Sequence, residues 1–251
     1  MIFVTGDCHG DFRKFSTQVF PEQKEMSRDD CVIVCGDFGI WADDSSERYW
    51  LKWLEEKPFT VLFVDGNHEN FDRLYGGEFP TVDFCGGKAH RIRSNVFHLM
   101  RGYVYEIEGK KFFTFGGAKS HDIDDGVLDE MDFPSREALL KKAKEMRKAN
   151  KMFRINHLSW WELELPTESE LEFGMQTLAQ HGNEVDFIVT HCCPQSIASL
   201  CGFRDGDILT QYFNAIAETV KFKKWFFGHY HGDKQILCDY IMLYEQIVRI
   251  V

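Results

Sequence analysis

Short runs of hydrophobic residues recur along the chain, and most end abruptly at a glycine or a polar residue. Continuous runs rich in β-branched and aromatic residues are typical of strands buried on both faces. Five such strands are predicted, at residues 2–5, 31–35, 59–64, 185–190 and 224–227. Helix-like stretches lie between them, at residues 11–20, 45–56, within 168–181 and at 207–219. This alternation predicts an α/β fold.

The middle and the end of the chain carry further strand-like segments. Residues 90–115 contain several short apolar pieces and a hairpin turn at 108–111, and the last residues are again strand-like. We therefore expect two sheets packed face to face and flanked by helices. Residues 118–166 interrupt this pattern with a charged amphipathic helix at 136–150, which predicts a helical insertion or lid. No linker rich in Gly, Pro or Ser divides the chain, so one domain over residues 1–251 is predicted.

Composition and charge narrow the classes of function. The formal net charge of −11 disfavours an extended grip on a nucleic-acid backbone. A small anionic substrate stays open, because bound metal ions reverse the local field. The eight cysteines form no C-x-x-C pair. The first residues do not resemble a signal peptide, and no apolar run has the length of a membrane span. We expect a cytoplasmic protein without a membrane partner.

Polar side chains follow each of the five predicted strands directly. They are Asp7 and His9 after the first, Asp37 after the second, Asn67, His68 and Glu69 after the third, His191 after the fourth, and His229 and His231 after the fifth. Ligands of α/β proteins bind beyond the carboxyl ends of the strands, so these side chains are expected to share one site.

The residue types predict what that site binds. Carboxylates and imidazoles together suit divalent or trivalent ions such as Mn, Fe or Zn, with Ni or Mg as further alternatives. Seven or more ligands are too many for one tetrahedral zinc, whereas they suit two metals that clamp the oxygens of a phosphoryl displacement. Each short motif alone is typical of a turn or a helix cap. Together they predict a dinuclear metal site.

The order D-x-H, G-D, G-N-H-E, H and G-H-x-H resembles the calcineurin-like metallophosphoesterase superfamily, and it extends from Asp7 to His231. The resemblance implies a four-layer α-β-β-α sandwich of two mixed β-sheets flanked by helices. It also implies metal ligands: Asp7, His9 and His231 for one ion, Asn67, His191 and His229 for the other, and Asp37 between them. The implied reaction is attack of a metal-bridging hydroxide on phosphorus. His68 would stabilise the transition state or protonate the leaving oxygen.

Three further residues are weaker candidates for the rim or the support of the site. Glu69 is expected to support a ligand or to cap backbone amides rather than to contact substrate. His121 follows a strand that could reach the rim. Trp41 follows Asp37 closely and is expected either to wall a substrate pocket or to belong to the core.

The motifs also separate branches of the superfamily. The Ser/Thr protein phosphatases carry an arginine in their second motif and another before G-N-H-E, whereas this chain has Phe38 and Gly39 after Asp37, and Asp65 before Gly66. An exonuclease-type diesterase would call for a basic platform. A non-enzymatic metal-binding scaffold is the alternative from another class, although His68 is retained. The sequence favours a phosphoesterase that cleaves diester or monoester bonds of a small nucleotide-like substrate.

Overall fold

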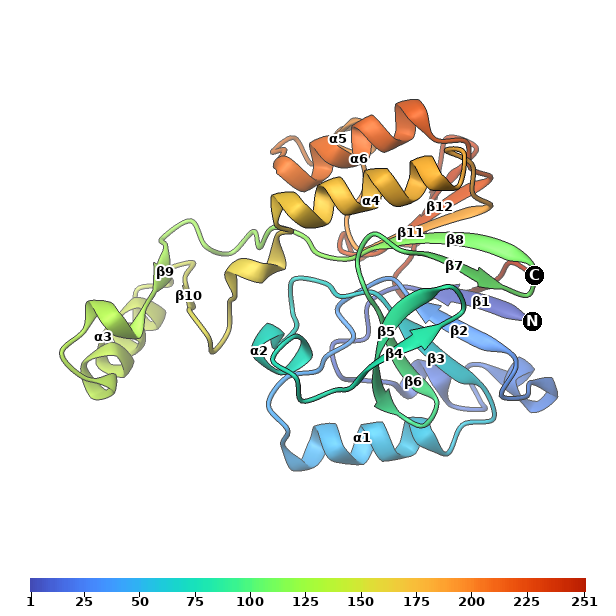
Figure 1. Cartoon of the computed structure of the whole chain (residues 1–251). Helices are drawn as coiled ribbons and strands as arrows, with labels where there is room; N and C mark the ends of the chain where they lie inside the picture. Colours follow the sequence, from blue (N-terminus) through green and yellow to red (C-terminus); the bar gives the residue numbers. More distant parts are fainter.

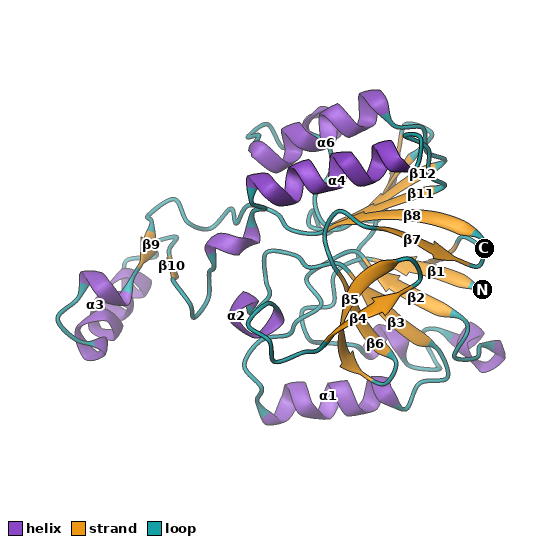
Figure 2. Ribbon diagram, in the orientation of Figure 1, coloured by secondary structure: helices purple, strands orange, loops and turns teal.

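The side chains of successive residues in the predicted strands lie in different hydrophobic cores. In the computed structural model, which describes residues 1–251, Ile2 and Val4 lie in a core between two sheets. Phe3, between them in sequence, packs on the opposite face with residues of a covering helix. Side chains alternate across a strand, so a continuous apolar run must be buried on both faces. This explains the four layers in Figure 1 and Figure 2, with helices outside two stacked sheets.

The first sheet has seven strands in the order β15-β1-β2-β3-β6-β5-β4. They are β1 (Ile2–Thr5), β2 (Cys31–Val34), β3 (Thr60–Phe63), β4 (Thr81–Phe84), β5 (Gly87–Arg93), β6 (Val96–Leu99) and β15 (Ile247–Arg249). β1, β2, β3 and β6 are parallel to one another. Their carboxyl ends therefore lie along one edge of the sheet.

The second sheet has six strands in the order β13-β14-β12-β11-β8-β7. They are β7 (Val104–Ile107), β8 (Lys110–Phe115), β11 (Phe187–Thr190), β12 (Lys224–Phe227), β13 (Lys234–Ile236) and β14 (Tyr240–Met242). The hairpin between β7 and β8 turns at Glu108 and Gly109, both with positive φ, 49° and 68°. Two such residues make the tight turn that was predicted at 108–111. Both sheets are mixed, which confirms the predicted fold class.

Helices cover the outer faces of the two sheets. α1 (Ser45–Glu55) lies on the first sheet, and α4 (Glu168–Gln180), α5 (Gln195–Leu200) and α6 (Ile208–Thr219) lie on the second (Figure 1). Leu51 and Leu54 of α1 share a core with β2 and β3. Polar caps fix where these helices begin: Asp44 accepts from the backbone of α1, and Thr167 and Asp207 form capping boxes at α4 and α6.

An arm, residues 123–156, projects from this body (Figure 1). It holds β9 (Val127–Leu128), the 3-10 turn η3 (Glu130–Asp132), α3 (Arg136–Lys148) and β10 (Arg154–Ile155). Its small core of Leu139, Ala143 and Ile155 is separate from the three larger ones. The chain then returns to the body through η4 (Glu162–Glu164). The arm lies within the predicted insertion at 118–166, and a lid action there stays a prediction.

Sequence periodicity was wrong about one helix and missed short elements. Residues 11–20 were expected to be helical, but they contain only the 3-10 turn η1 (Arg13–Phe15), and η2 (Pro21–Glu25) follows. Ser16 is extended, and a residue before a proline, here Phe20, is biased away from the helical region. The short helices α2 (Phe71–Leu74) and α5 were not predicted, nor was β4. No helix is both long and apolar enough to cross a membrane.

Candidate metal centre

Loops after three strands of each sheet meet at one edge of the sandwich. β1, β2 and β3 lead into Asp7, Asp37 and Asn67. β11 and β12 lead into His191 and His229 from the second sheet, and β8 leads into the segment from 116 to 121. The seven predicted ligands are thus brought together from both sheets, as the strand-end pattern predicts. That they hold metal ions stays a prediction.

Four of the seven lie in the left-handed region of the backbone. The φ values are 49° at His9, 46° at Asp37, 65° at His229 and 48° at His231. A residue other than glycine rarely adopts this conformation, and it persists only where the surroundings enforce it. Such sharp turns aim successive side chains of one loop at a common point. Left-handed backbone also occurs at seven other non-glycine residues of the chain, so it is a feature of these ligand loops but not unique to them.

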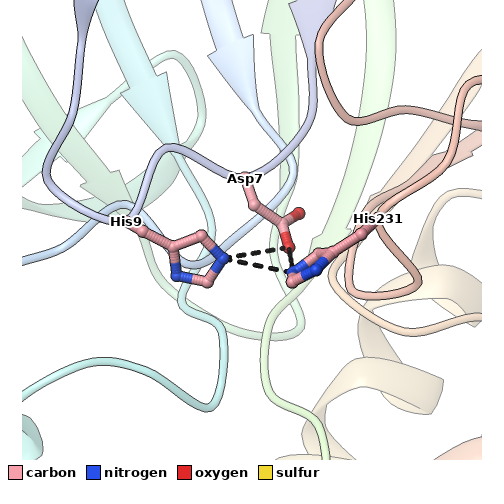
Figure 3. Close-up of side chains that lie close together, drawn as sticks. All are labelled: Asp7, His9 and His231. Carbon is pink, nitrogen blue, oxygen red and sulfur yellow. Dashed lines mark hydrogen bonds and ion pairs between the residues drawn. The ribbon is translucent and has the colours of Figure 1, made fainter.

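Asp7, His9 and His231 converge on one point (Figure 3). Oδ2 of Asp7 is buried and receives no hydrogen bond of good geometry. Nε2 of His231 lies 3.2 Å from this oxygen, and Nε2 of His9 lies 3.7 Å from it. The two nitrogens are 3.2 Å apart. Donor atoms at such separations fit around one ion with ligand distances of about 2.0 to 2.2 Å. These three residues therefore fit a metal ion.

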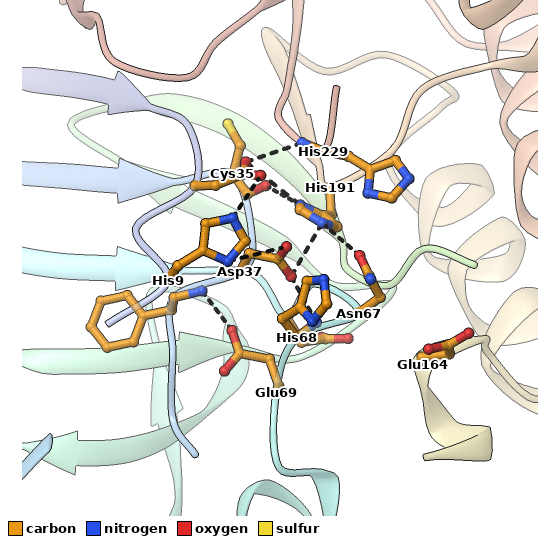
Figure 4. A network of polar contacts seen from close by, with 12 residues as sticks. His9, Cys35, Asp37, Asn67, His68, Glu69, Glu164, His191 and His229 are labelled. Atoms are coloured by element: carbon orange, nitrogen blue, oxygen red, sulfur yellow. Dashed lines mark hydrogen bonds and ion pairs between the residues drawn. The ribbon is translucent and has the colours of Figure 1, made fainter. Parts of the chain in front are cut away.

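A second group is formed by Asp37, His191 and Asn67 (Figure 4). Nδ1 of His191 lies 2.7 Å from the carbonyl oxygen of Cys35, to which it donates, so Nε2 is the nitrogen that could bind a metal ion. Nε2 lies 3.3 Å from Oδ1 of Asp37 and 3.2 Å from Oδ1 of Asn67. His9 also approaches Asp37, with Nδ1 3.7 Å from Oδ2. Asp37 therefore lies between the two groups, where the resemblance expects a bridging carboxylate.

In this second group, Asp37 and His191 shift each other's pKa. Burial alone would lower the pKa of His191, but Asp37 and then Asp7 outweigh it and raise that pKa to about 9. Burial alone would raise the pKa of Asp37, but His191 holds it well below its usual range. Without a cation, the imidazolium of His191 supplies the positive charge that the buried carboxylates require.

His229 lies between the site and His121. Its backbone N–H donates to Oδ1 of Asp7 at 3.0 Å, and its ring lies 4.9 Å from that of His191. Its Nε2 is 2.8 Å from Nε2 of His121. Burial and then His191 lower the pKa of His229 well below its ordinary value. The structure thus brings His121, a weak candidate, against a predicted ligand.

His68 and Trp41 line a cavity next to the two groups. The backbone N–H of His68 donates to Oδ1 of Asp37 at 2.8 Å, and its ring lies 5.5 Å from that of His9. Burial lowers the pKa of His68, whereas Asp37 opposes this. The cavity, of about 360 Å³, is lined by His9, His68 and Trp41 among others. Trp41 is braced edge-on by the buried Trp161, with centroids 5.4 Å apart.

Glu69 is fully buried and lies away from the rim. Its carboxylate accepts backbone N–H groups of Phe38 at 2.6 Å and Ile40 at 2.9 Å. It therefore holds the loop that follows Asp37. This geometry agrees with the expectation that Glu69 caps backbone amides.

Three residues that support the site were not predicted from the sequence. The buried amine of Lys14 donates to the carbonyl oxygens of Asp7, at 2.8 Å, and Tyr244, at 2.5 Å, and so braces the first ligand loop. Ser120 and Glu164 lie behind Asn67. Lys14 gave a weak signal, a lysine among the buried phenylalanines of 11–20. Ser120 and Glu164 gave none, because their contact joins distant parts of the chain.

Comparisons with known proteins agree with this geometry. The profile of a family described as calcineurin-like phosphoesterase matches residues 1–233. Lariat debranching enzyme A from Xenopus laevis is 27% identical in an alignment of 145 residues that covers 51% of this chain and 26% of that protein. The match therefore spans about a quarter of the relative's length.

Proposed function

The chain belongs to the calcineurin-like phosphoesterase family, and from this premise we propose that it hydrolyses a phosphodiester of a small nucleotide-like molecule at a dinuclear metal site. The observation that carries the proposal is the convergence of Asp7, His9 and His231 beside Asp37 and His191, with a buried carboxylate oxygen left without a hydrogen bond. The name of the matched relative refers to debranching. We do not assign that activity to this chain, because the match covers only 26% of that protein.

The donor set supports the choice of metals. Asp7, His9 and His231 would hold one ion, Asn67, His191 and His229 the other, and Asp37 would contact both. Mixed carboxylate and imidazole donors fit Mn, Fe, Zn or Ni better than Mg, which prefers oxygen ligands. Bound metals would supply Lewis acidity and an activated water at neutral pH.

Two cavities that share His9 as a wall favour a diester. The first contains Trp41, Asp44 and Glu47 and no Lys or Arg, so it suits an uncharged planar group better than a second phosphate. The second, of about 480 Å³, is lined by Tyr244 and Asp7 and also by the cationic side chains of Arg13 and Lys14. A phosphodiester has two ester arms, and each cavity can take one. His68, at the mouth of the first, is placed to stabilise the transition state or to protonate the leaving oxygen.

The environment of Asp65 counts against a protein phosphatase. The resemblance noted above places a phosphate-binding arginine at this position in that branch. Here Asp65 is fully buried, and its Oδ2 accepts from Nε of Arg101 at 2.9 Å. Asp65 therefore turns inward and offers no cation to a substrate phosphate.

The test is hydrolysis of bis-p-nitrophenyl phosphate beside p-nitrophenyl phosphate by the metal-reconstituted chain. Diester turnover is expected, with Asp37→Asn losing both turnover and bound metal, because a neutral amide replaces the shared carboxylate. His68→Ala should keep its metal and lose rate mainly on esters with poor leaving groups. Monoester-only turnover would refute the diester proposal. Two bound metals without turnover on either ester would favour the interaction scaffold.

A further inference from the structure

The side-chain amide of Asn67 can bind a metal ion only if its oxygen points toward that ion. Its oxygen and nitrogen ends are nearly equal in shape, but only the oxygen can be a ligand. Oδ1 lies 3.2 Å from Nε2 of His191, on the side of the predicted ligands. Nδ2 lies on the other side and donates to Oγ of Ser120 at 3.3 Å. Asn67 is buried, so no bulk water competes for its nitrogen.

Ser120 can accept from Asn67 because its own proton is committed elsewhere. Its Oγ–H donates to Oε2 of Glu164 at 2.6 Å, and its backbone N–H donates to Oε1 at 2.8 Å. Above a pH of about 7, the value to which burial raises the pKa of Glu164, the ionised carboxylate receives both donors and leaves a lone pair of Oγ for the amide of Asn67. Ser120 and Glu164 are both almost completely buried. The direction of each hydrogen bond in this relay is therefore set by Glu164.

Glu164 is itself held rigidly against the third strand end. Nη2 of Arg101 donates to the carbonyl oxygen of Leu163 at 2.7 Å, and the same guanidinium is paired with Asp65. Gly117 approaches so closely that a Cβ there would lie 2.6 Å from the carbonyl oxygen of Glu164. The relay and its support are thus anchored on the segment that carries Asn67.

We propose that Glu164 and Ser120 are positioning residues that orient the amide of Asn67 toward one metal ion, so that the returning end of the insertion sets the affinity of that site. This inference rests on the proposed metal site. It predicts that the relay can be reversed. In Glu164→Gln, the side-chain NH2 can donate to Oγ of Ser120, whose proton then points at Asn67 and favours the flipped amide.

The experiment is titration of the metal-free full chain with cobalt(II), followed by calorimetry and by the visible spectrum of the bound ion. Wild type should bind two equivalents. Glu164→Gln and Ser120→Ala should weaken one equivalent by about 10- to 100-fold, the usual effect of removing a partner of a ligand. The other equivalent, with its spectrum, should be unchanged. Glu162→Gln, an exposed residue of the same turn, is the matched control.

Several outcomes would overturn the inference. Unchanged binding of both equivalents in both variants would show that the relay does not orient Asn67. Equal weakening of both equivalents together with a lower unfolding temperature would show a structural role only. If Glu164→Gln does not fold, the smaller change Ser120→Ala decides by the same criteria. Failure of wild type to bind cobalt would instead refute the proposed metal site.

Discussion

At the scale of single residues, one chain of contacts links two buried histidines to a buried carboxylate. Nε2 of His98 lies 3.0 Å from Oδ1 of Asp65, and Nδ1 of His98 lies 3.0 Å from Nδ1 of His90. Burial would raise the pKa of Asp65, but Arg101 and His98 hold it below its usual range. The ionised carboxylate of Asp65 accepts from Nε2 of His98. One of the two Nδ1 atoms in contact must donate to the other.

His90 should make stability depend on pH. Burial and then His98 lower its pKa to about 4, whereas the unfolded chain binds a proton near pH 6.5. The unfolded state thus gains a proton first as pH falls, and the free energy of unfolding should drop by about 1 to 2 kcal/mol between pH 7.5 and 5. His90→Asn keeps a donor near the same position and should flatten this dependence. Urea unfolding with a chelator present measures it.

A single comparison decides that prediction. The slope of unfolding free energy against pH should differ between wild type and His90→Asn as pH falls from about 7.5 to 5. Identical slopes for the two proteins would show that His90 is protonated equally in the folded and unfolded states.

At the scale of elements, the ends of the strands approach so closely that glycine is required. A Cβ on Gly36 would lie 2.3 Å from Nδ1 of His191, and φ at Gly36 is +93°. Gly66 and Gly228 are similar, with a Cβ 2.0 Å from Oδ1 of Asp37 and 2.1 Å from Oδ1 of Asp7, respectively. The strand ends can therefore bring ligand side chains together only while these positions lack a side chain.

Gly36→Ala should abolish metal binding while Gly77→Ala should not. Gly77 has a similar φ of +90°, but a Cβ there meets nothing within 4 Å. Both variants should lose about 1 to 2 kcal/mol of stability from the left-handed backbone, and only Gly36→Ala displaces His191. Metal titration and urea unfolding of the two proteins separate these effects. Equal metal affinity in both variants would contradict the role given to Gly36.

The sequence predicted those helices and strands whose own residues show a clear hydrophobic pattern. β1 and β2 are short but uninterrupted by polar residues, and α1 and α6 show clear helical spacing with caps. α2, with four residues, is too short to show a period. The predicted ligands stand directly after strands, so local sequence reveals them. Ser120 and Glu164 support the site through a contact across 44 positions, which only folding creates.

At the scale of the whole molecule, the arm is attached through a narrow neck. Asp122 pairs with Arg154 across it, with Nε 2.9 Å from Oδ1. The backbone N–H of Asp125 donates to the carbonyl oxygen of Met152 at 2.8 Å. Beyond this point, the arm has only its own small core. No buried residue of α3 belongs to the three large cores.

Replacing residues 126–151 by a short Gly-Ser linker should therefore leave the body folded. The ends to be joined are already adjacent, and shortening a loop changes closure entropy little, so stability should change by less than about 1 kcal/mol. Cobalt binding should be retained, since Arg154, Glu164 and Ser120 all remain. Thermal unfolding and metal titration check both points. Loss of cooperative unfolding would show that the arm is part of the folding unit.

The close approach at Gly36 also has a genetic consequence. Glycine and alanine codons differ by one base, so a single mutation at this position would remove the proposed metal binding without altering any of the seven predicted ligand residues. The descendants of such a mutant would keep every letter by which the site is recognised, yet they would be inactive. Inspection of the ligand motifs alone would count them as enzymes. The glycines at the strand ends should therefore be examined together with the ligands when active members of this family are distinguished from inactive ones.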